Sequence, residues 1–217
     1  MTFGTYPQGA NGEVEPIEWL VLDAQDGKAL LISRYGLDAH RFDASTYQGW
    51  DKSEIREWLN STFLNIAFTD KEQECIVTTT VKTSNNADWA AFAKKKGWSY
   101  DSLDGGFDTQ DKIFLLSLEE AMEYSDYSTL EDFYNKGTEK LQAVPTAYAV
   151  AQGAYQSSSN TLDGTGCCWW WLRSPGYLSN FASYIYFDGS LYYDLVYLVN
   201  GAVRPAFWLN LDSADIY

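Results

Sequence analysis

Basic residues are scarce in this chain of 217 residues, which has 15 Lys and Arg against 30 Asp and Glu and a net charge of −15. Nucleic acids and anionic membranes bind basic surfaces, so neither is an expected partner. No stretch approaches the ~18 consecutive apolar residues of a membrane-spanning helix, so no membrane insertion is predicted. The N-terminus also lacks a basic segment followed by an apolar run, which is the pattern of a signal peptide.

Histidine and cysteine are also rare, with one and three residues. A catalytic triad or a histidine-based metal site needs partners that His40 lacks in this sequence, so a structural or solvated role is expected. Three cysteines, two of them adjacent (Cys75, Cys167 and Cys168), do not form a disulfide framework and indicate a reducing compartment. Adjacent cysteines also lack the C-x-x-C spacing of redox sites, so Cys167 and Cys168 are expected to be buried and structural.

Motifs for binding nucleotides or metals and for acid–base catalysis are missing. The sequence has neither a Walker loop nor a dinucleotide-binding glycine motif, and the turn at 163–166 is too short for a calcium loop. The acidic pairs Glu119-Glu120 and Glu131-Asp132 fall in the first turns of expected helices, where carboxylates oppose the helix dipole. We therefore predict a protein that is not an enzyme and has no cofactor, metal site or catalytic residue.

One segment, residues 177–202, lacks five residue types at once: Lys, Glu, Gln, Met and Trp. These types make up about a fifth of the chain, so about five of them would be expected in a window of this length. Tyr, Phe, Ser, Asn, Asp, Leu and Gly fill the segment instead. Binding loops favour this composition because Tyr gives a large contact area at low rotamer cost, while Ser, Asn and Gly hydrogen-bond adaptably. The segment is the first candidate for a binding surface.

The pattern along the chain predicts one α+β domain over residues 1–217. Apolar runs at 16–23 and 28–33 are joined through Asp26-Gly27, a strong hairpin signal. Helical periodicity and capping residues predict helices in the first two thirds, at 53–64 (capped by Ser53), 69–75, 86–96, 117–125, 129–136 and 146–153. Pro145 is expected to suit the first turn of the last of these helices. Residues 112–116 are predicted as a buried strand, 97–111 and 154–166 as loops, and the C-terminal third as β-rich.

Both sides of segment 177–202 have the composition of a packed scaffold. Trp169, Trp170 and Trp171 could stack on carbohydrate, but rings in a strand alternate between its faces, so a structural role is favoured. Arg173 and Arg204 lie beside prolines at the two ends. We expect both to be buried, with their guanidinium groups donating to loop carbonyls, so that they frame the segment without touching a ligand.

Motifs at both ends of the chain resemble a bacterial and phage domain family of unknown function. The opening motif is FGTYPQ at residues 3–8, and the closing motif is VRPAFWL at 203–209. Further matches are IEW at 17–19, IREWLN at 55–60 and WLRSPG at 171–176. The resemblance covers nearly the whole chain. Members of this family include variable proteins of diversity-generating retroelements, which resemble C-type lectins in fold.

This resemblance implies a C-type-lectin-like fold and a segment that an error-prone reverse transcriptase diversifies. In such systems AAY codons become NNY codons, which cannot encode Lys, Glu, Gln, Met or Trp, the five types absent here. The positions implied to vary, and therefore to bind ligand, are Tyr177, Leu178, Asn180, Phe181, Tyr184, Tyr186, Phe187, Ser190, Tyr192, Tyr193, Asp194, Leu195, Tyr197, Leu198 and Val199. The positions expected to be fixed scaffold are Ala182, Ile185, Asp188, Gly189, Leu191, Val196 and Gly201, with a turn at Asp188-Gly189.

The expected function is non-enzymatic binding of a protein or cell-surface ligand, of the receptor or adhesion type, compatible with display on a phage or cell surface. Tyr186, Tyr192 and Tyr193 are the first candidates for energetically dominant contacts, each weakening binding by ~1–3 kcal/mol when truncated. Calcium-dependent sugar binding is not expected, because the lectin Glu-Pro-Asn triplet is absent.

Two alternatives stay open at this point. The first is an oxidase or hydrolase on the related fold of the formylglycine-generating oxidases, for which Cys167 and Cys168 would have to face a cleft. The second is a structural cell-envelope module whose tyrosines form an ordinary hydrophobic β core.

Overall fold

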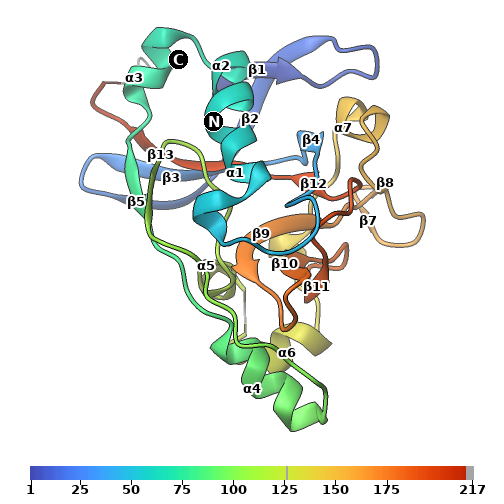
Figure 1. The fold of residues 1–217 in the computed structure, drawn as a ribbon. Coiled ribbons are helices and arrows are strands. Elements are labelled where there is room, and N and C mark those ends of the chain that lie inside the picture. The colour runs from blue at the N-terminus through green and yellow to red at the C-terminus, as the bar shows by residue number, and fades with distance from the viewer. Residues whose placement is uncertain (126, 214–217) are drawn as a thin grey trace.

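The computed structural model describes residues 1–125 and 127–213. It is a mixed structure of helices and sheets in which every helix of the described residues ends by Ala151, and the rest of the described chain forms short strands and turns (Figure 1). The predicted α+β class, with a β-rich C-terminal part, is confirmed. In the described residues, none of the helices has the length and apolar character that a membrane span requires.

The first sheet is antiparallel and unites the two ends of the chain. Its strands, in spatial order, are β1 (Thr2–Pro7), β2 (Val14–Gln25), β3 (Lys28–Ser33) and β13 (Ala206–Asn210). The predicted hairpin at Asp26-Gly27 is confirmed. Both residues have positive φ, 49° and 70°, the backbone that a two-residue hairpin turn requires.

The second sheet contains the segment singled out in the sequence. Its spatial order is β11 (Leu191–Leu195), β10 (Phe181–Ile185), β9 (Trp170–Pro175), β12 (Ala202–Val203) and β4 (Asp38–Ala39). β12 runs parallel to β9, and the other neighbours are antiparallel. The predicted Asp188-Gly189 turn joins β10 to β11, with Gly189 at φ 82° and its N–H donating to the Tyr186 carbonyl at 2.9 Å.

Three predictions about strands need correction. The predicted loop 97–111 contains β6 (Thr109–Asp111), which pairs with β5 (Thr79–Val81) from before α4 (Ala87–Lys96), and the predicted loop 154–166 contains the small hairpin of β7 (Thr161–Leu162) and β8 (Thr165–Gly166). Strands of two or three residues carry too little alternation to be recognised from sequence. The predicted strand 112–116 is buried but forms only a single bridge, between Phe114 and Ala206.

The predicted helix at 53–64 forms and extends to residue 67. It consists of α1 (Glu54–Trp58), a π-helical turn η2 (Leu59–Phe63) and α2 (Leu64–Ala67), and the Ser53 hydroxyl caps it by accepting from the Arg56 N–H. Within the π turn, the Asn60 side chain binds the neighbouring backbone. Its oxygen accepts from the N–H groups of Lys112 and Ile113, and its nitrogen donates to the Ile113 carbonyl at 2.8 Å. This bonding replaces the ladder that a strand at 112–116 would have had.

The remaining predicted helices form near their expected bounds. They are α3 (Asp70–Cys75), α4 (Ala87–Lys96), α5 (Leu118–Tyr124), α6 (Leu130–Asn135) and α7 (Ala147–Ala151), with short 3-10 turns η1 (Trp50–Lys52) and η3 (Glu139–Leu141). Pro145 directly precedes the cap of α7, where the Thr146 hydroxyl accepts from the Ala149 N–H, so the helix follows Pro145 as predicted. Figure 1 shows α4 and α6 together at the lower end of the molecule, beside β10 and β11.

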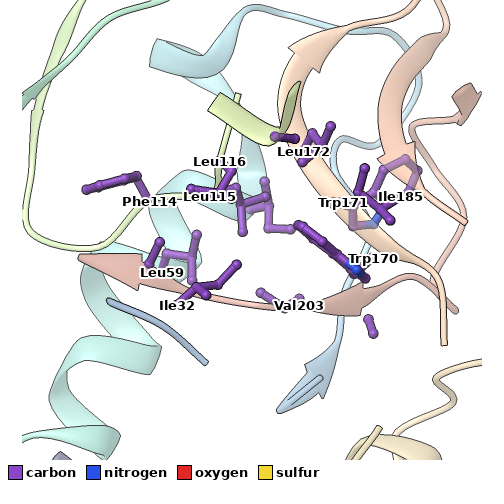
Figure 2. Packing of buried hydrophobic residues seen from close by; sticks show 14 of the residues in the cluster. Ile32, Leu59, Phe114, Leu115, Leu116, Trp170, Trp171, Leu172, Ile185 and Val203 are labelled. Atoms are coloured by element: carbon purple, nitrogen blue, oxygen red, sulfur yellow. The ribbon is translucent and has the colours of Figure 1, made fainter. Parts of the chain in front are cut away.

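One cluster of buried hydrophobic residues connects the two sheets. Trp170 of β9 is fully buried, and its indole N–H donates to the Leu141 carbonyl at 3.0 Å. Figure 2 shows its ring directed toward Leu115 and Val203, between the 114–116 segment and the chain that leads into the first sheet. β9 is therefore fixed inside the protein, and β10 and β11 extend from it toward the surface.

Candidate functional site

The expected scaffold positions of segment 177–202 are buried. Ala182, Ile185, Leu191 and Val196 have no exposed surface, Gly189 and Gly201 are buried, and only Asp188 is half-buried. The two glycines are required by close contacts. A Cβ on Gly189 would lie 1.9 Å from the Thr138 carbonyl oxygen, and a Cβ on Gly201 would lie 2.4 Å from the Trp171 indole nitrogen.

The candidate ligand-binding residues are mostly half-buried. Tyr197 and Val199 are exposed, at 44% and 64%. The half-buried candidates are Tyr177, Leu178, Asn180, Phe181, Tyr186, Phe187, Tyr192, Tyr193, Asp194, Leu195 and Leu198. These side chains are neither sealed in the core nor fully solvated, so each has a packed side and a side that another molecule could contact.

Two candidates are buried, so their assignment as surface contacts is wrong. Tyr184 is 6% exposed because it pairs with Trp171 across the β9–β10 ladder and packs on the Trp169 ring, with centroids 4.9 Å apart. Ser190 is 2% exposed because its hydroxyl turns back into the hairpin and donates to the Asp188 carboxylate. Both belong to the scaffold.

Some of the remaining candidates pack under α4 in an inner aromatic cluster, formed by Trp89, Trp98, Tyr177, Phe181 and Tyr193. The Tyr193 ring lies 4.4 Å from that of Tyr177, and 5.2 Å from both Phe181 and Trp89, between centroids. Trp98 closes the cluster at 5.6 Å from Tyr177. The Trp89 indole also donates to the buried Ser183 hydroxyl at 2.8 Å, which ties α4 to β10. Tyr193 therefore acts mainly in packing.

A second group of rings, which we call the aromatic strip, follows the β10–β11 turn. It consists of Tyr155, Phe187, Tyr186, Tyr192 and Tyr134 in spatial order. Successive ring centroids are 5.8, 3.6, 5.1 and 4.6 Å apart. Tyr155 is 43% exposed, and the other four side chains are half-buried. The strip is thus a continuous row of accessible rings.

Sequence reasoning missed two members of the strip, because they lie outside segment 177–202. Tyr134 belongs to α6. Tyr155 belongs to the loop after α7, and its own backbone N–H donates to the Asn200 carbonyl at 3.0 Å. The composition of residues 155–160, rich in Tyr, Ser and Asn, was an available signal for Tyr155. Nothing in the sequence around Tyr134 distinguishes it from an ordinary helix residue.

The flanking arginines are buried, as expected. Arg204 is 1% exposed, donates twice to the Ser33 carbonyl at 2.9 and 3.0 Å, and lies over the Trp170 ring. Arg173 is 4% exposed and donates to the carbonyls of Leu115 and Lys82. Arg173 also forms a two-pronged ion pair with Glu120 of α5, at 2.6 and 2.8 Å, which the sequence did not predict.

The tryptophans and cysteines before β10 are structural. Trp169, Trp170 and Trp171 are 6%, 0% and 0% exposed, which leaves no ring free to stack on a sugar. Cys167 and Cys168 are both buried. Burial raises the pKa of the Cys168 thiol to about 12, so the reactive thiolate is disfavoured there.

In the part of the chain that the structure describes, His40 and the acidic side chains do not assemble a metal site. His40 is half-buried and stacks on Trp58, with ring centroids 5.1 Å apart. Among residues 1–125 and 127–213, no three His, Cys, Asp or Glu side chains cluster in a way that could hold an ion.

A buried carboxylate, Asp43, supports the outer side of the segment. Its backbone N–H donates to the Val196 carbonyl, and its carboxylate accepts from the N–H groups of Glu54 and Gln48. Burial raises the pKa of Asp43 from 3.8 to about 6, because desolvation outweighs these hydrogen bonds. The Asp43 carboxyl group therefore stays protonated to a higher pH in the folded protein than in the unfolded chain.

This raised pKa predicts a pH-dependent difference between the wild type and Asp43→Asn. The stability contributed by protonated Asp43 is complete below pH 3.8 and is lost as the pH rises to about 6. The free energy of unfolding of the wild type, measured relative to that of Asp43→Asn, should thus fall between pH 4 and 6. Loss of the hydrogen bond from Gln48 in the variant adds a difference that does not change with pH. Urea unfolding of both proteins at pH 4, 5, 6 and 7 measures this. Parallel curves for the two proteins would show that Asp43 does not titrate in this range.

Among known families, the model of the Domain of unknown function (DUF6273) matches residues 26–211, a range that contains the strands of both sheets except β1 and β2. No curated protein and no solved structure matches the chain.

Proposed function

Since this chain belongs to the DUF6273 family, we propose that it is a non-enzymatic ligand-binding protein of the receptor or adhesion type. Its contact surface would be the accessible part of segment 177–199, diversified by a retroelement, and its ligand a protein or cell-surface molecule. A C-type-lectin-like fold is part of this proposal. The terminal sequence motifs and the β-rich C-terminal part support it.

The observation that carries the proposal is the separation of two kinds of position within one hairpin. Scaffold positions such as Ala182, Ile185 and Leu191 have no exposed surface, while Tyr186, Phe187 and Tyr192 remain accessible on the same strands and turn. A hairpin held from one side by β9 can change its accessible side chains at little cost in stability, because surface substitutions away from special contacts usually change it by about 0.5 kcal/mol or less.

The composition of the segment gives independent support. Mutation of AAY codons at adenines yields only residues encoded by NNY, and all five types that NNY cannot encode are absent from residues 177–202. The half-buried Tyr and Phe side chains also form the kind of accessible apolar surface that monomeric proteins rarely keep unless it binds something.

The enzyme alternative has no comparable support. It required Cys167 and Cys168 to face a cleft, and both are buried. The structural-module alternative is favoured by the inner aromatic cluster, whose rings pack under α4. The aromatic strip favours ligand binding, because its rings continue out of the core onto accessible surface.

The proposal predicts where closely related genes differ. Sequencing of sibling loci should show substitutions concentrated at the accessible positions of 177–199, such as Tyr186, Phe187, Tyr192 and Tyr197. Ala182, Ile185 and Leu191 should stay constant. A near-copy of the 3′ coding region, differing at adenines, should lie beside a reverse transcriptase gene. A tail that is invariant among siblings, or substitutions spread evenly over the domain, would refute diversification.

A further inference from the structure

The side chains of the aromatic strip are partly exposed, and a ring face that reaches solvent can accept a cation. Tyr155, Phe187, Tyr186, Tyr192 and Tyr134 follow one another at centroid distances between 3.6 and 5.8 Å. A Lys or Arg side chain within about 6 Å of such a centroid is attracted by the negative face of the ring. A row of several rings offers several such positions, which suits the side chains of a protein better than a single small cation.

Two carboxylates lie among these rings. Asp188 follows Phe187 in the hairpin turn, and Asp194 lies two residues after Tyr192, on the same side of β11. Both side chains are half-buried. Burial raises the pKa of the Tyr186 and Tyr192 hydroxyls, and the Asp188 charge raises both further, so this charge acts directly on the strip.

The hairpin segment itself carries no basic residue, since residues 177–202 contain no Lys and no Arg. The flanking Arg173 and Arg204 are buried and bonded inside the protein. On the helices beside the strip, Lys136 pairs with Asp132, and Lys95 and Lys96 pair with Glu131. The accessible part of the hairpin therefore has a negative formal charge, within a chain whose net charge is −15.

From this arrangement we propose that the aromatic strip binds a basic protein surface, with Arg or Lys side chains over its rings and beside Asp188. The inference rests on the proposed binding function and names the chemistry of the partner. It also assigns contact roles to Tyr155 and Tyr134, which lie outside the diversified segment and would stay constant while their neighbours change. Rings and carboxylates together attract Arg strongly, since both the stacking and the ion pair contribute.

The test is calorimetric titration with three synthetic peptides of equal length, (Gly-Arg)6, (Gly-Gln)6 and (Gly-Glu)6, at physiological ionic strength. The arginine peptide should bind the wild type measurably more tightly than the other two. Tyr155→Ala should weaken it about three- to tenfold, which corresponds to the range of a partly desolvated cation–π contact. Tyr155→Phe, which keeps the ring, should bind within about twofold of the wild type, and Asp188→Asn should weaken binding about two- to fivefold.

Two matched variants separate the strip from general attraction to an acidic protein. Tyr100 is 44% exposed, against 43% for Tyr155, and Asp26 is an exposed carboxylate at the β2–β3 turn. Tyr100→Ala and Asp26→Asn should leave the affinity for (Gly-Arg)6 within about twofold of the wild type. Circular dichroism of each variant establishes that it is folded.

Three results would overturn the inference: no binding of (Gly-Arg)6 at millimolar concentration, equal binding of (Gly-Gln)6, or equal losses in the matched variants. None of them concerns the sibling sequences. If variation among siblings is confined to the accessible positions while (Gly-Arg)6 does not bind, the proposed binding function is supported and the proposal of a basic partner is refuted. If the tail is invariant while (Gly-Arg)6 binds at the strip, the basic partner stands and diversification does not.

Discussion

Replacing Trp170 by alanine should lower the free energy of unfolding by about 3–5 kcal/mol, the range for truncation of a large buried aromatic side chain. The ring is fully buried in the cluster that connects the two sheets, and its indole N–H donates to the Leu141 carbonyl. Alanine would leave a cavity there and an acceptor without its donor. Urea unfolding followed by circular dichroism measures the loss.

Trp208 provides a matched control for this truncation. It belongs to β13 and is half-buried, so Trp208→Ala removes the same side chain from a site that water already reaches. Its loss should be clearly smaller than that of Trp170→Ala. Trp170→Phe should fall between the wild type and Trp170→Ala because it keeps most of the buried volume. A loss below about 1 kcal/mol for Trp170→Ala would mean that β9 does not anchor the second sheet.

Arg173→Ala should also destabilise the protein by about 2–4 kcal/mol, because it removes the buried partner of an ion pair whose other side chain, Glu120, is 32% exposed, and leaves buried carbonyls without donors. Arg173 is 4% exposed and bonds the Glu120 carboxylate, the Leu115 carbonyl and the Lys82 carbonyl. Alanine leaves these acceptors unsatisfied at the point where β9, α5 and the 114–116 segment meet. Thermal and urea unfolding measure the effect.

Two further variants test the reason for this loss. The double variant Arg173→Ala with Glu120→Gln no longer has the Glu120 charge that Arg173→Ala leaves without a partner. Its loss in free energy of unfolding should therefore be smaller than the sum of the losses of the two single variants. Arg34→Ala breaks an ion pair with Glu18 whose side chains are 50% and 47% exposed, and it should cost at most about 1 kcal/mol. An unchanged melting temperature in Arg173→Ala together with lost ligand binding would reassign Arg173 from the scaffold to the binding surface.

Local structure was predictable where a few neighbouring residues determine it. Asp26-Gly27 forms the expected turn with both residues at positive φ, and in the Asp188-Gly189 turn the glycine supplies the positive φ. Ser53 caps its helix because its hydroxyl reaches the Arg56 N–H. The division of the hairpin into buried scaffold and accessible side chains was also largely predictable, since glycine, alanine and β-branched residues are placed where space is tight.

Burial of individual tyrosines was not predictable, because it depends on segments that are distant in the chain. Tyr184 and Tyr192 are direct partners in the β10–β11 ladder and point to the same side of the sheet. Tyr184 lies over Trp169 and is buried, whereas Tyr192 lies at the edge beside Tyr134 and remains accessible. Strand alternation gives the side of the sheet, but it does not give the neighbour that covers that side.

Residues that are close together in the chain were enough to specify the α+β class, most helices and turns, and a segment whose composition suits contact. Tertiary packing was needed to establish which rings are accessible, and it brought Tyr134 and Tyr155 to the edge of the hairpin. The reason is that β11 is an edge strand, so its accessible surface is completed by α6 and by the loop after α7, whose sequences contain no sign of that contact.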